Sequence, residues 1–178
     1  VPLYWDHGVV VMLDQRQLPA REVWNRYADH REVAAAIQRL EVRGAPAIGN
    51  AAALAVVAAA RQLPRDAERF AAGFAAICDH LQAARPTAVN LAWALQRQRA
   101  VLARTLEADG DIDAALAALE TEALALIEQD AAACRAIGAH GARLIPHGAT
   151  VLTHCHTGAL ATGGHGTAIG VIRSAHEA

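Results

Sequence analysis

The residues best suited to chemistry lie in the segment Thr153-His-Cys-His-Thr-Gly158. Cys155 carries a thiol, and the glycine-rich stretch after it leads into an apolar run at residues 168–172 that predicts the start of a helix. A thiol at the carboxyl end of a strand and near a helix N-terminus lies where open α/β sheets bind ligands and where a thiolate is stabilised. We therefore expect Cys155 to have a functional role. The alternative is a small buried hydrophobic residue, which is what free cysteines usually are.

The histidines beside this cysteine raise metal binding as a second possibility. If the strand extends this far, the alternation of side chains puts His154 and His156 on one side and Cys155 on the other. The three side chains could then not easily bind one metal ion, and His165 is the nearby candidate for a further ligand. We expect no metal and no other cofactor, and a metal-dependent hydrolase that uses this cluster is the alternative.

Two arginines, each just before a predicted helix start, are candidates for binding an anion. Arg43 is followed by Gly44, which permits a tight turn, and by Pro46, which suits the first turn of a helix. Arg85 precedes a proline that opens another helix. Free backbone N–H groups beside a guanidinium suit a phosphate group. Either segment alone could be an ordinary turn with a surface arginine, but two such helix starts in one domain favour a shared anion pocket.

The elements that must position these residues fall into two groups. Residues 3–5 and 9–13 are β-prone runs separated by Asp-His-Gly, and residues 21–27 could add a third strand, so we expect a small antiparallel sheet. From His30 onward the chain is rich in alanine, and its apolar spacing predicts helices. The expected helices cover residues 31–40, 46–62, 65–83, 87–108 and 112–139. In the last of these, apolar residues at three- and four-residue steps predict a single buried face. They are Ile112, Leu116, Leu119, Ala123 and Leu126.

A proline and a glycine between Arg143 and Gly148 mark an expected domain boundary. Residues 1–147 are then a mainly helical N-terminal domain with a small sheet. Residues 148–178 start a Rossmann-like domain with a buried strand at Ala149–Thr153, so the predicted class is α/β overall. One parallel strand cannot bury both faces or complete its ladder. We therefore expect the remainder of this second domain to lie outside the sequence given.

The composition of the chain limits which kinds of partner the protein is expected to bind and which cellular compartment it is expected to occupy. The chain has 178 residues, of which 54% are hydrophobic and 19% charged, enough for a sizeable core. A formal net charge of −2 gives no broad positive surface for nucleic acid or an anionic membrane. The most apolar stretch, Ala51–Ala60, is too short to cross a bilayer. The cysteines form no CxxC pair, which fits a reducing cytoplasm, and Cys78 and Cys134 fall inside helical patterns as packing residues.

Four segments together resemble the methylthioribose-1-phosphate isomerases. That family belongs to a wider group with the ribose-1,5-bisphosphate isomerases and the regulatory subunits of the translation-initiation guanine-nucleotide exchange factor 2B. The segments are LDQRQLP at Leu13–Pro19, VRGAPAIG at Val42–Gly49, RPTAVNLAWAL at Arg85–Leu95 and THCHTGALATGGHGTAIGVIRSAHE at Thr153–Glu177. The chain departs from the family pattern at His156, where asparagine is usual, and at His165, where an aromatic residue is usual.

The resemblance implies isomerisation of 5-methylthioribose 1-phosphate to 5-methylthioribulose 1-phosphate in methionine salvage, by a homodimer. It implies that Arg43, Gly44 and Ala45 contact the substrate. Arg85 would help to hold the phosphate, and Cys155 would be the active-site thiol. The family's catalytic aspartate, an asparagine–lysine pair and a glutamine belong to a C-terminal domain beyond this chain, which would hold only part of the site. A ribose-1,5-bisphosphate isomerase and a non-catalytic regulatory member are the alternatives within the group.

Overall fold

The computed structural model describes residues 1–108 and 110–178, and begins with a small antiparallel sheet. Strands β1 (Leu3–Asp6), β2 (Val9–Leu13) and β3 (Trp24–Tyr27) pair in the order β1-β2-β3. The turn between β1 and β2 has φ of 47° at His7 and 102° at Gly8, the left-handed conformation that tight hairpins require. The predicted hairpin is confirmed, and the third strand begins later than the prediction, at Trp24.

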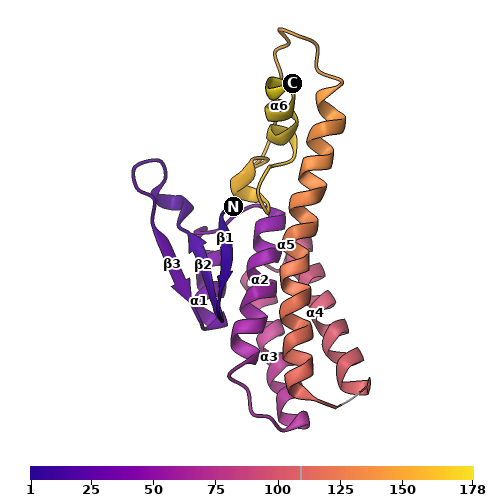
Figure 1. The fold of residues 1–178 in the computed structure, drawn as a ribbon. Coiled ribbons are helices and arrows are strands. Elements are labelled where there is room, and N and C mark those ends of the chain that lie inside the picture. Colours follow the sequence, from indigo (N-terminus) through magenta and orange to yellow (C-terminus); the bar gives the residue numbers. More distant parts are fainter. Residues whose placement is uncertain (109) are drawn as a thin grey trace.

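In the described ranges, six α-helices follow the sheet (Figure 1). They are α1 (His30–Gln38), α2 (Ala45–Ala60), α3 (Ala67–Ala84), α4 (Val89–Ala108), α5 (Ile112–Ala142) and α6 (Ala168–Glu177). The 3-10 turns η1 (Gln15–Gln17) and η2 (Ala159–Ala161) lie in the connections between these elements. The helices expected from apolar spacing are therefore confirmed, with ends that differ by a few residues.

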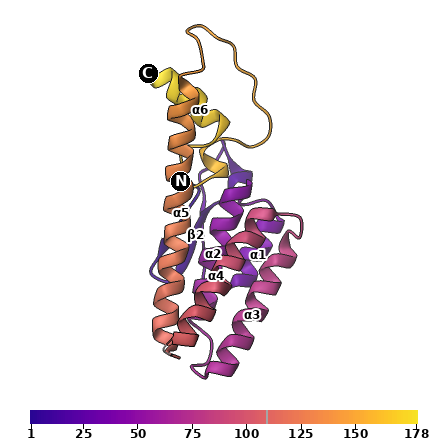
Figure 2. The same cartoon turned by 90° about the vertical axis from the view of Figure 1, so that its right-hand side faces the viewer.

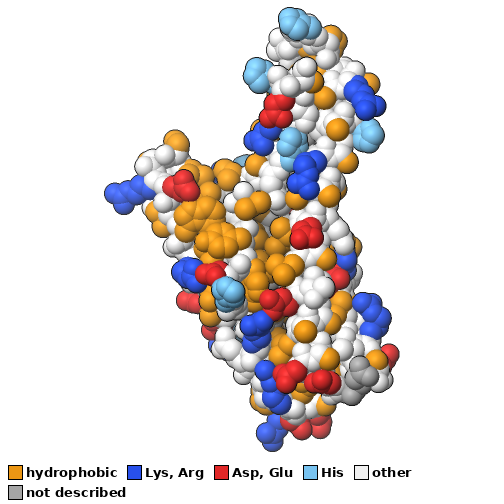
Figure 3. All heavy atoms as spheres, in the orientation of Figure 1, with side chains coloured by type: hydrophobic (Ala, Val, Ile, Leu, Met, Phe, Trp, Pro, Cys, Tyr) orange, Lys and Arg blue, Asp and Glu red, His pale blue; other side chains and the backbone are white. Residues whose placement is uncertain are grey.

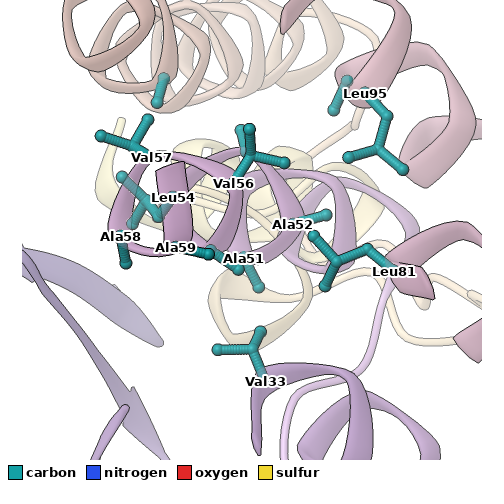
Figure 4. Packing of buried hydrophobic residues seen from close by; sticks show 14 of the residues in the cluster. Val33, Ala51, Ala52, Leu54, Val56, Val57, Ala58, Ala59, Leu81 and Leu95 are labelled. Atoms are coloured by element: carbon teal, nitrogen blue, oxygen red, sulfur yellow. The ribbon is translucent and has the colours of Figure 1, made fainter. Parts of the chain in front are cut away.

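Helix α2 forms the centre of the helical domain. Every residue from Ala47 to Ala60 is buried, as expected for a helix that is apolar on all sides. It packs against α1, α3, α4 and α5, and its alanines allow close approach of these neighbours (Figures 2 and 4). Larger side chains such as Leu81 on α3 and Leu95 on α4 fill the space around it. This rigid centre fixes where the N-terminus of α2 lies.

Helix α5 extends beyond the bundle, and α6 packs along the protruding end (Figure 1). The predicted apolar face of α5 is buried from Ile112 to Leu126, so that prediction is confirmed. Glycines on α5 make room for α6. A Cβ at Gly138 would lie 2.5 Å from the hydroxyl oxygen of Ser174, and one at Gly141 would lie 2.6 Å from Val171. The contact between the two helices therefore depends on these glycines.

The strand predicted at Ala149–Thr153 is wrong for this structure. The segment has no regular secondary structure and lies in a loop that extends away from α5 and α6 (Figure 2). Val151 is 43% exposed and Leu152 is 96% exposed. A strand needs a neighbour to complete its hydrogen bonds, and no described residue pairs with this segment.

Apolar side chains also gather on the outer face of the sheet (Figure 3). There the exposed rings of Tyr4 and Trp24 pack with centroids 5.6 Å apart.

Across the described ranges, no helix combines the length and the hydropathy needed to span a membrane.

Candidate functional site

A cavity of about 620 Å³ opens between the first turns of α2 and α4 and the segment that leads into α6. Each residue that the sequence singled out for catalysis or substrate binding lines this cavity. They are Arg43, Gly44, Ala45, Arg85 and Cys155. These residues come from three segments that are far apart in the sequence, and the fold brings them to one surface.

The N-termini of α2, α4 and α6 all border this cavity. Elsewhere the first turn is closed by an aspartate, since Asp29, Asp66 and Asp111 accept hydrogen bonds from the backbone at the starts of α1, α3 and α5. Gly44 and Thr167 precede α2 and α6, and neither supplies a side-chain cap. Uncapped first turns present free N–H groups and the positive end of the helix dipole. The cavity therefore favours an anion.

Arg43 adds a charged group to these helix ends. Its Nε atom is buried and has no hydrogen-bond partner among the described residues. An unsatisfied buried donor costs about 1–3 kcal/mol, more when the group is charged, so a donor left in this way at a cavity wall suits a ligand. Arg85, half-buried between α3 and α4, supplies a second guanidinium to the same cavity. The sequence-based expectation of one shared anion pocket agrees with this geometry.

Gly44 brings the two sides of the cavity into contact. Its φ is 101°, and a Cβ at this position would lie 2.4 Å from the Cβ of Ala161 and 2.5 Å from the Cα. A residue with a side chain would collide with the backbone of η2. Glycine therefore permits both the turn into α2 and the close approach of the segment that carries Cys155.

Cys155 lies in an irregular loop, not at the end of a strand. Its φ is 72°, and its side chain is exposed and lines the cavity. The loop folds back on itself, because the N–H of Thr167 donates to the carbonyl of Thr157 at 2.8 Å. This bond places the start of α6 beside the thiol. The prediction that Cys155 and a helix N-terminus are neighbours is confirmed, although the strand is absent.

The other two cysteines are packing residues, as predicted. Cys78 on α3 and Cys134 on α5 are both buried. Burial raises the pKa of Cys78 to about 12 and also raises the pKa of Cys134, so both thiols stay protonated at neutral pH. Cys155 is the exposed thiol among the three.

The histidines near Cys155 separate in space. His156 lines the cavity with Cys155, which differs from the predicted alternation because no strand forms here. His165 lies against α6, where its Nε2 is 3.1 Å from the carbonyl of Gly170 and 2.9 Å from the hydroxyl of Ser174. Over the residues that the structure describes, no three His, Cys, Asp or Glu side chains gather at a single metal position.

Sequence reasoning did not single out Asn90 or Thr167 as cavity residues, although both line it. Asn90 lies in the first turn of α4, and Thr167 immediately precedes α6. Both residues lie at predicted helix starts, and this position is the sequence signal that could have identified them as cavity residues.

A buried cluster of charged and polar side chains also escaped sequence reasoning. The carboxylate of Glu41, which is 2% exposed, accepts hydrogen bonds from Tyr27 at 2.6 Å, Arg39 at 2.8 Å, Arg16 at 3.1 Å and Asn25 at 3.2 Å. These partners join the sheet to the turn between α1 and α2. Since Glu41 is two residues before Arg43, the cluster fixes the backbone that enters the cavity.

Asp14 belongs to this cluster through Arg16, whose guanidinium donates to the Asp14 carboxylate at 2.8 Å. Acid is expected to weaken the cluster. The hydrogen bond from Arg16 outweighs burial and lowers the pKa of Asp14 below its ordinary value of 3.8. Burial opposes ionisation of Glu41, but the bonds from Tyr27 and Arg39, with others, outweigh burial and lower its pKa below 4.5. Both pKa values are depressed in the folded protein. Their contribution to stability is therefore complete above the ordinary values and is lost as the pH falls through and below them.

We therefore expect the Tm of the protein to fall steeply between about pH 5 and pH 3. Calorimetry on the wild type and on Asp14→Asn measures this effect, and the variant should show the shallower dependence on pH over this range. Parallel curves for the two proteins would show that Asp14 contributes nothing to acid sensitivity.

Comparison with known proteins agrees with these features. Residues 41–178 match the model of the "Initiation factor 2 subunit family". The chain is 50% identical over 175 residues to the methylthioribose-1-phosphate isomerase of Geobacter metallireducens, covering 98% of this chain and 50% of the relative. It is 54% identical over 177 residues to the enzyme of the same name from Syntrophotalea carbinolica, covering 99% and 51%.

Two solved structures have the same fold. One is titled 5-methylthioribose 1-phosphate isomerase from Pyrococcus horikoshii OT3, with a TM-score of 0.88 and 35% identity over 99% of this chain and 49% of that chain. The other is titled translation initiation factor eIF-2B, subunit delta, from A. fulgidus, with a TM-score of 0.85 and 36% identity over 99% and 51%. The chain spans about half the length of the curated relatives it matches. By sequence and by fold, the chain belongs to the initiation factor 2 subunit family.

Proposed function

We propose that the full-length protein is an aldose–ketose isomerase that converts 5-methylthioribose 1-phosphate to 5-methylthioribulose 1-phosphate in methionine salvage. The observation that carries the proposal is the meeting of Arg43, Arg85 and Cys155 at one cavity bordered by helix N-termini. A phosphate-binding surface beside an exposed thiol suits a sugar phosphate. Relatives at about half identity are named as this isomerase, which supports the same substrate.

The proposed substrate explains why such a site is needed. Its C1 carries the phosphate, so the anomeric hydroxyl is blocked and the ring cannot open by itself. An acid must protonate the ring oxygen, and we assign this acid to a carboxyl group of the second domain whose pKa is raised by burial. Hydrogen then moves from C2 to C1, and the C2 hydroxyl group loses its proton as the C2 carbonyl forms, which balances the proton added to the ring oxygen. Cys155 acts near C2, as the base if a proton moves or by stabilising developing charge if a hydride moves.

In this proposal the helical domain binds the phosphate and orients the sugar. Arg43 and Arg85 pair with phosphate oxygens, and the first turns of α2 and α4 donate backbone N–H groups. Binding energy from the phosphate, which does not react, then holds C1 and C2 in position near the thiol.

Turnover by the full-length protein tests the proposal. We expect a higher kcat/KM for 5-methylthioribose 1-phosphate than for ribose 1,5-bisphosphate, because the relatives carry the name of the first substrate. Equal or faster turnover of the bisphosphate would instead assign the protein to the sister activity.

Replacing Arg43 with methionine tests the phosphate site. Loss of a charge-assisted hydrogen bond should raise KM by about tenfold to a hundredfold, with a similar rise in the Ki of inorganic phosphate. The matched control is Arg104→Met, which removes an exposed arginine of α4 that does not line this cavity. Unchanged phosphate inhibition in Arg43→Met would place the anion elsewhere.

A non-catalytic regulatory role is the second candidate, because a solved relative of the same fold is titled as a translation initiation factor subunit. The two candidates differ in turnover. A full-length protein that binds the sugar phosphate but leaves it unchanged would have the regulatory role.

The proposal extends to the setting of the protein. We propose that residues 148–178 open a second, Rossmann-like domain in the full-length protein. We also propose a homodimer in a reducing cytoplasm, on the family resemblance and the free cysteines. Light scattering on the full-length protein checks the dimer.

A further inference from the structure

Gln15 connects the sheet to the Cys155 loop, defined here as residues 155–167. It is the first residue of η1, two residues after the end of β2, and it is 5% exposed although its side chain is polar. Its side-chain Nε2 donates to the carbonyl of Leu160 at 2.8 Å. The two residues are separated by 145 positions in the sequence. This contact therefore ties the N-terminal sheet to the loop that carries the thiol.

The backbone of Gln15 is tied to the opposite side of the cavity. Its N–H donates to the carbonyl of Glu41 at 3.0 Å, just before the turn that contains Arg43 and Gly44. Gln15 thus bonds both walls of the cavity. Its backbone bonds the segment leading into the turn that contains Arg43, and its side chain bonds the Cys155 loop. The contact of Gly44 with Ala161 lies next to the bond at Leu160, so the two walls meet at adjacent points.

Near the thiol, the loop is attached to the preceding segment by a hydrogen bond between the hydroxyl groups of Thr153 and Thr157, 3.2 Å apart. The N–H groups of Ala161, Thr162 and Thr167 bond to carbonyls within the loop itself. At its far end the N–H of Gly163 donates to Asp130 on α5. The Cys155 end of the loop is exposed, and η2 is held from outside the loop by packing against α2 and by the side-chain bond from Gln15.

We propose that Gln15 is a positioning residue that sets the distance between the Cys155 thiol and the phosphate-binding arginines. The role rests on the proposed function, because it concerns how that site is assembled. Gln15 does not touch the substrate. Its amide keeps the loop against the turn that contains Arg43, so loss of the amide displaces the thiol. Arg43 stays in the turn that the Glu41 cluster holds, and Arg85 stays between α3 and α4.

The test uses Gln15→Met in the full-length protein, which keeps the length of the side chain and removes the donor. We expect kcat for 5-methylthioribose 1-phosphate to fall about tenfold, the size of effect that loss of one buried hydrogen bond can produce. The Ki of inorganic phosphate should stay within about twofold of wild type, because the arginine side is unchanged. Hydrogen exchange at the backbone amides of residues 157–167 should be about tenfold faster.

Two further variants make the result specific. Gln15→Glu keeps the shape but turns the donor into an acceptor that faces the Leu160 carbonyl, so it should lower kcat at least as much as Gln15→Met. Gln62→Met is the matched control, since the Gln62 side chain also donates to a backbone carbonyl, that of Ala28 at 3.0 Å, away from the cavity. It should leave kcat and exchange in the loop unchanged.

Several outcomes would overturn the proposal. Wild-type kcat and loop exchange in Gln15→Met would show that the amide positions nothing. Equal losses of kcat and of phosphate affinity would show that Gln15 supports the whole cavity and does not position the loop. If the wild type does not turn over the sugar phosphate, the proposed function fails, whereas the exchange rates still decide whether Gln15 holds the loop.

Discussion

Replacing Cys155 with serine in the full-length protein is expected to lower kcat on the order of a thousandfold, with KM changed by less than about threefold. A hydroxyl has nearly the shape of a thiol but is a much weaker acid and nucleophile. In the proposed function, the exposed thiol acts on the sugar, whereas Arg43 and Arg85 bind the phosphate. Steady-state kinetics with 5-methylthioribose 1-phosphate measure both quantities.

The control for this variant is His154→Gln, which changes an exposed neighbour of Cys155 that does not line the cavity. It should keep kcat close to wild type. Kinetics of Cys155→Ser that match wild type would remove the thiol from the chemistry. A rise in KM with constant kcat would make Cys155 a binding residue only.

Replacing Gly44 with alanine is expected to lower the free energy of unfolding by about 3 kcal/mol or more. Two effects add at this position. The φ of 101° is unfavourable for any residue with a side chain, and the new Cβ would lie within 2.6 Å of the backbone of Ala161. Either the turn into α2 or the Cys155 loop must move. Urea unfolding measures the stability, and loss of turnover should accompany it because the two cavity walls separate.

Gly148→Ala separates the two effects. Gly148 has a φ of 74°, and a Cβ there would meet nothing within 4 Å. This control substitution should lower the free energy of unfolding by about 1 kcal/mol, from backbone strain alone. Equal losses for the two variants would mean that the contact between Gly44 and Ala161 contributes nothing to stability.

The helical domain could be predicted from sequence because its signals are local. The spacing of apolar residues from Ile112 to Leu126 sets one face of α5, and that face is buried. The Asp-His-Gly turn requires the left-handed backbone that the structure has at His7 and Gly8. Glycine and proline at the start of α2 likewise fix a turn that needs no distant partner.

The features of the fold and the site that the sequence did not predict depend on contacts between distant residues. The apolar letters of Ala149–Thr153 predict a strand, but a strand exists only beside another, and none of the described strands lies there. The bonds from Gln15 to Leu160 and from Tyr27 to Glu41 join residues that no short pattern links. Cys155 lies near a helix start, as the local pattern predicts, but the strand that the sequence predicts just before it is absent from the described residues.

A crystal structure of the full-length Cys155→Ser protein with 5-methylthioribose 1-phosphate bound would test the account most directly. The account predicts phosphate oxygens within about 3.2 Å of the guanidinium groups of Arg43 and Arg85, with C2 of the sugar facing the side chain at position 155. A sugar phosphate bound with neither arginine in contact, or with C2 turned away from position 155, would contradict it.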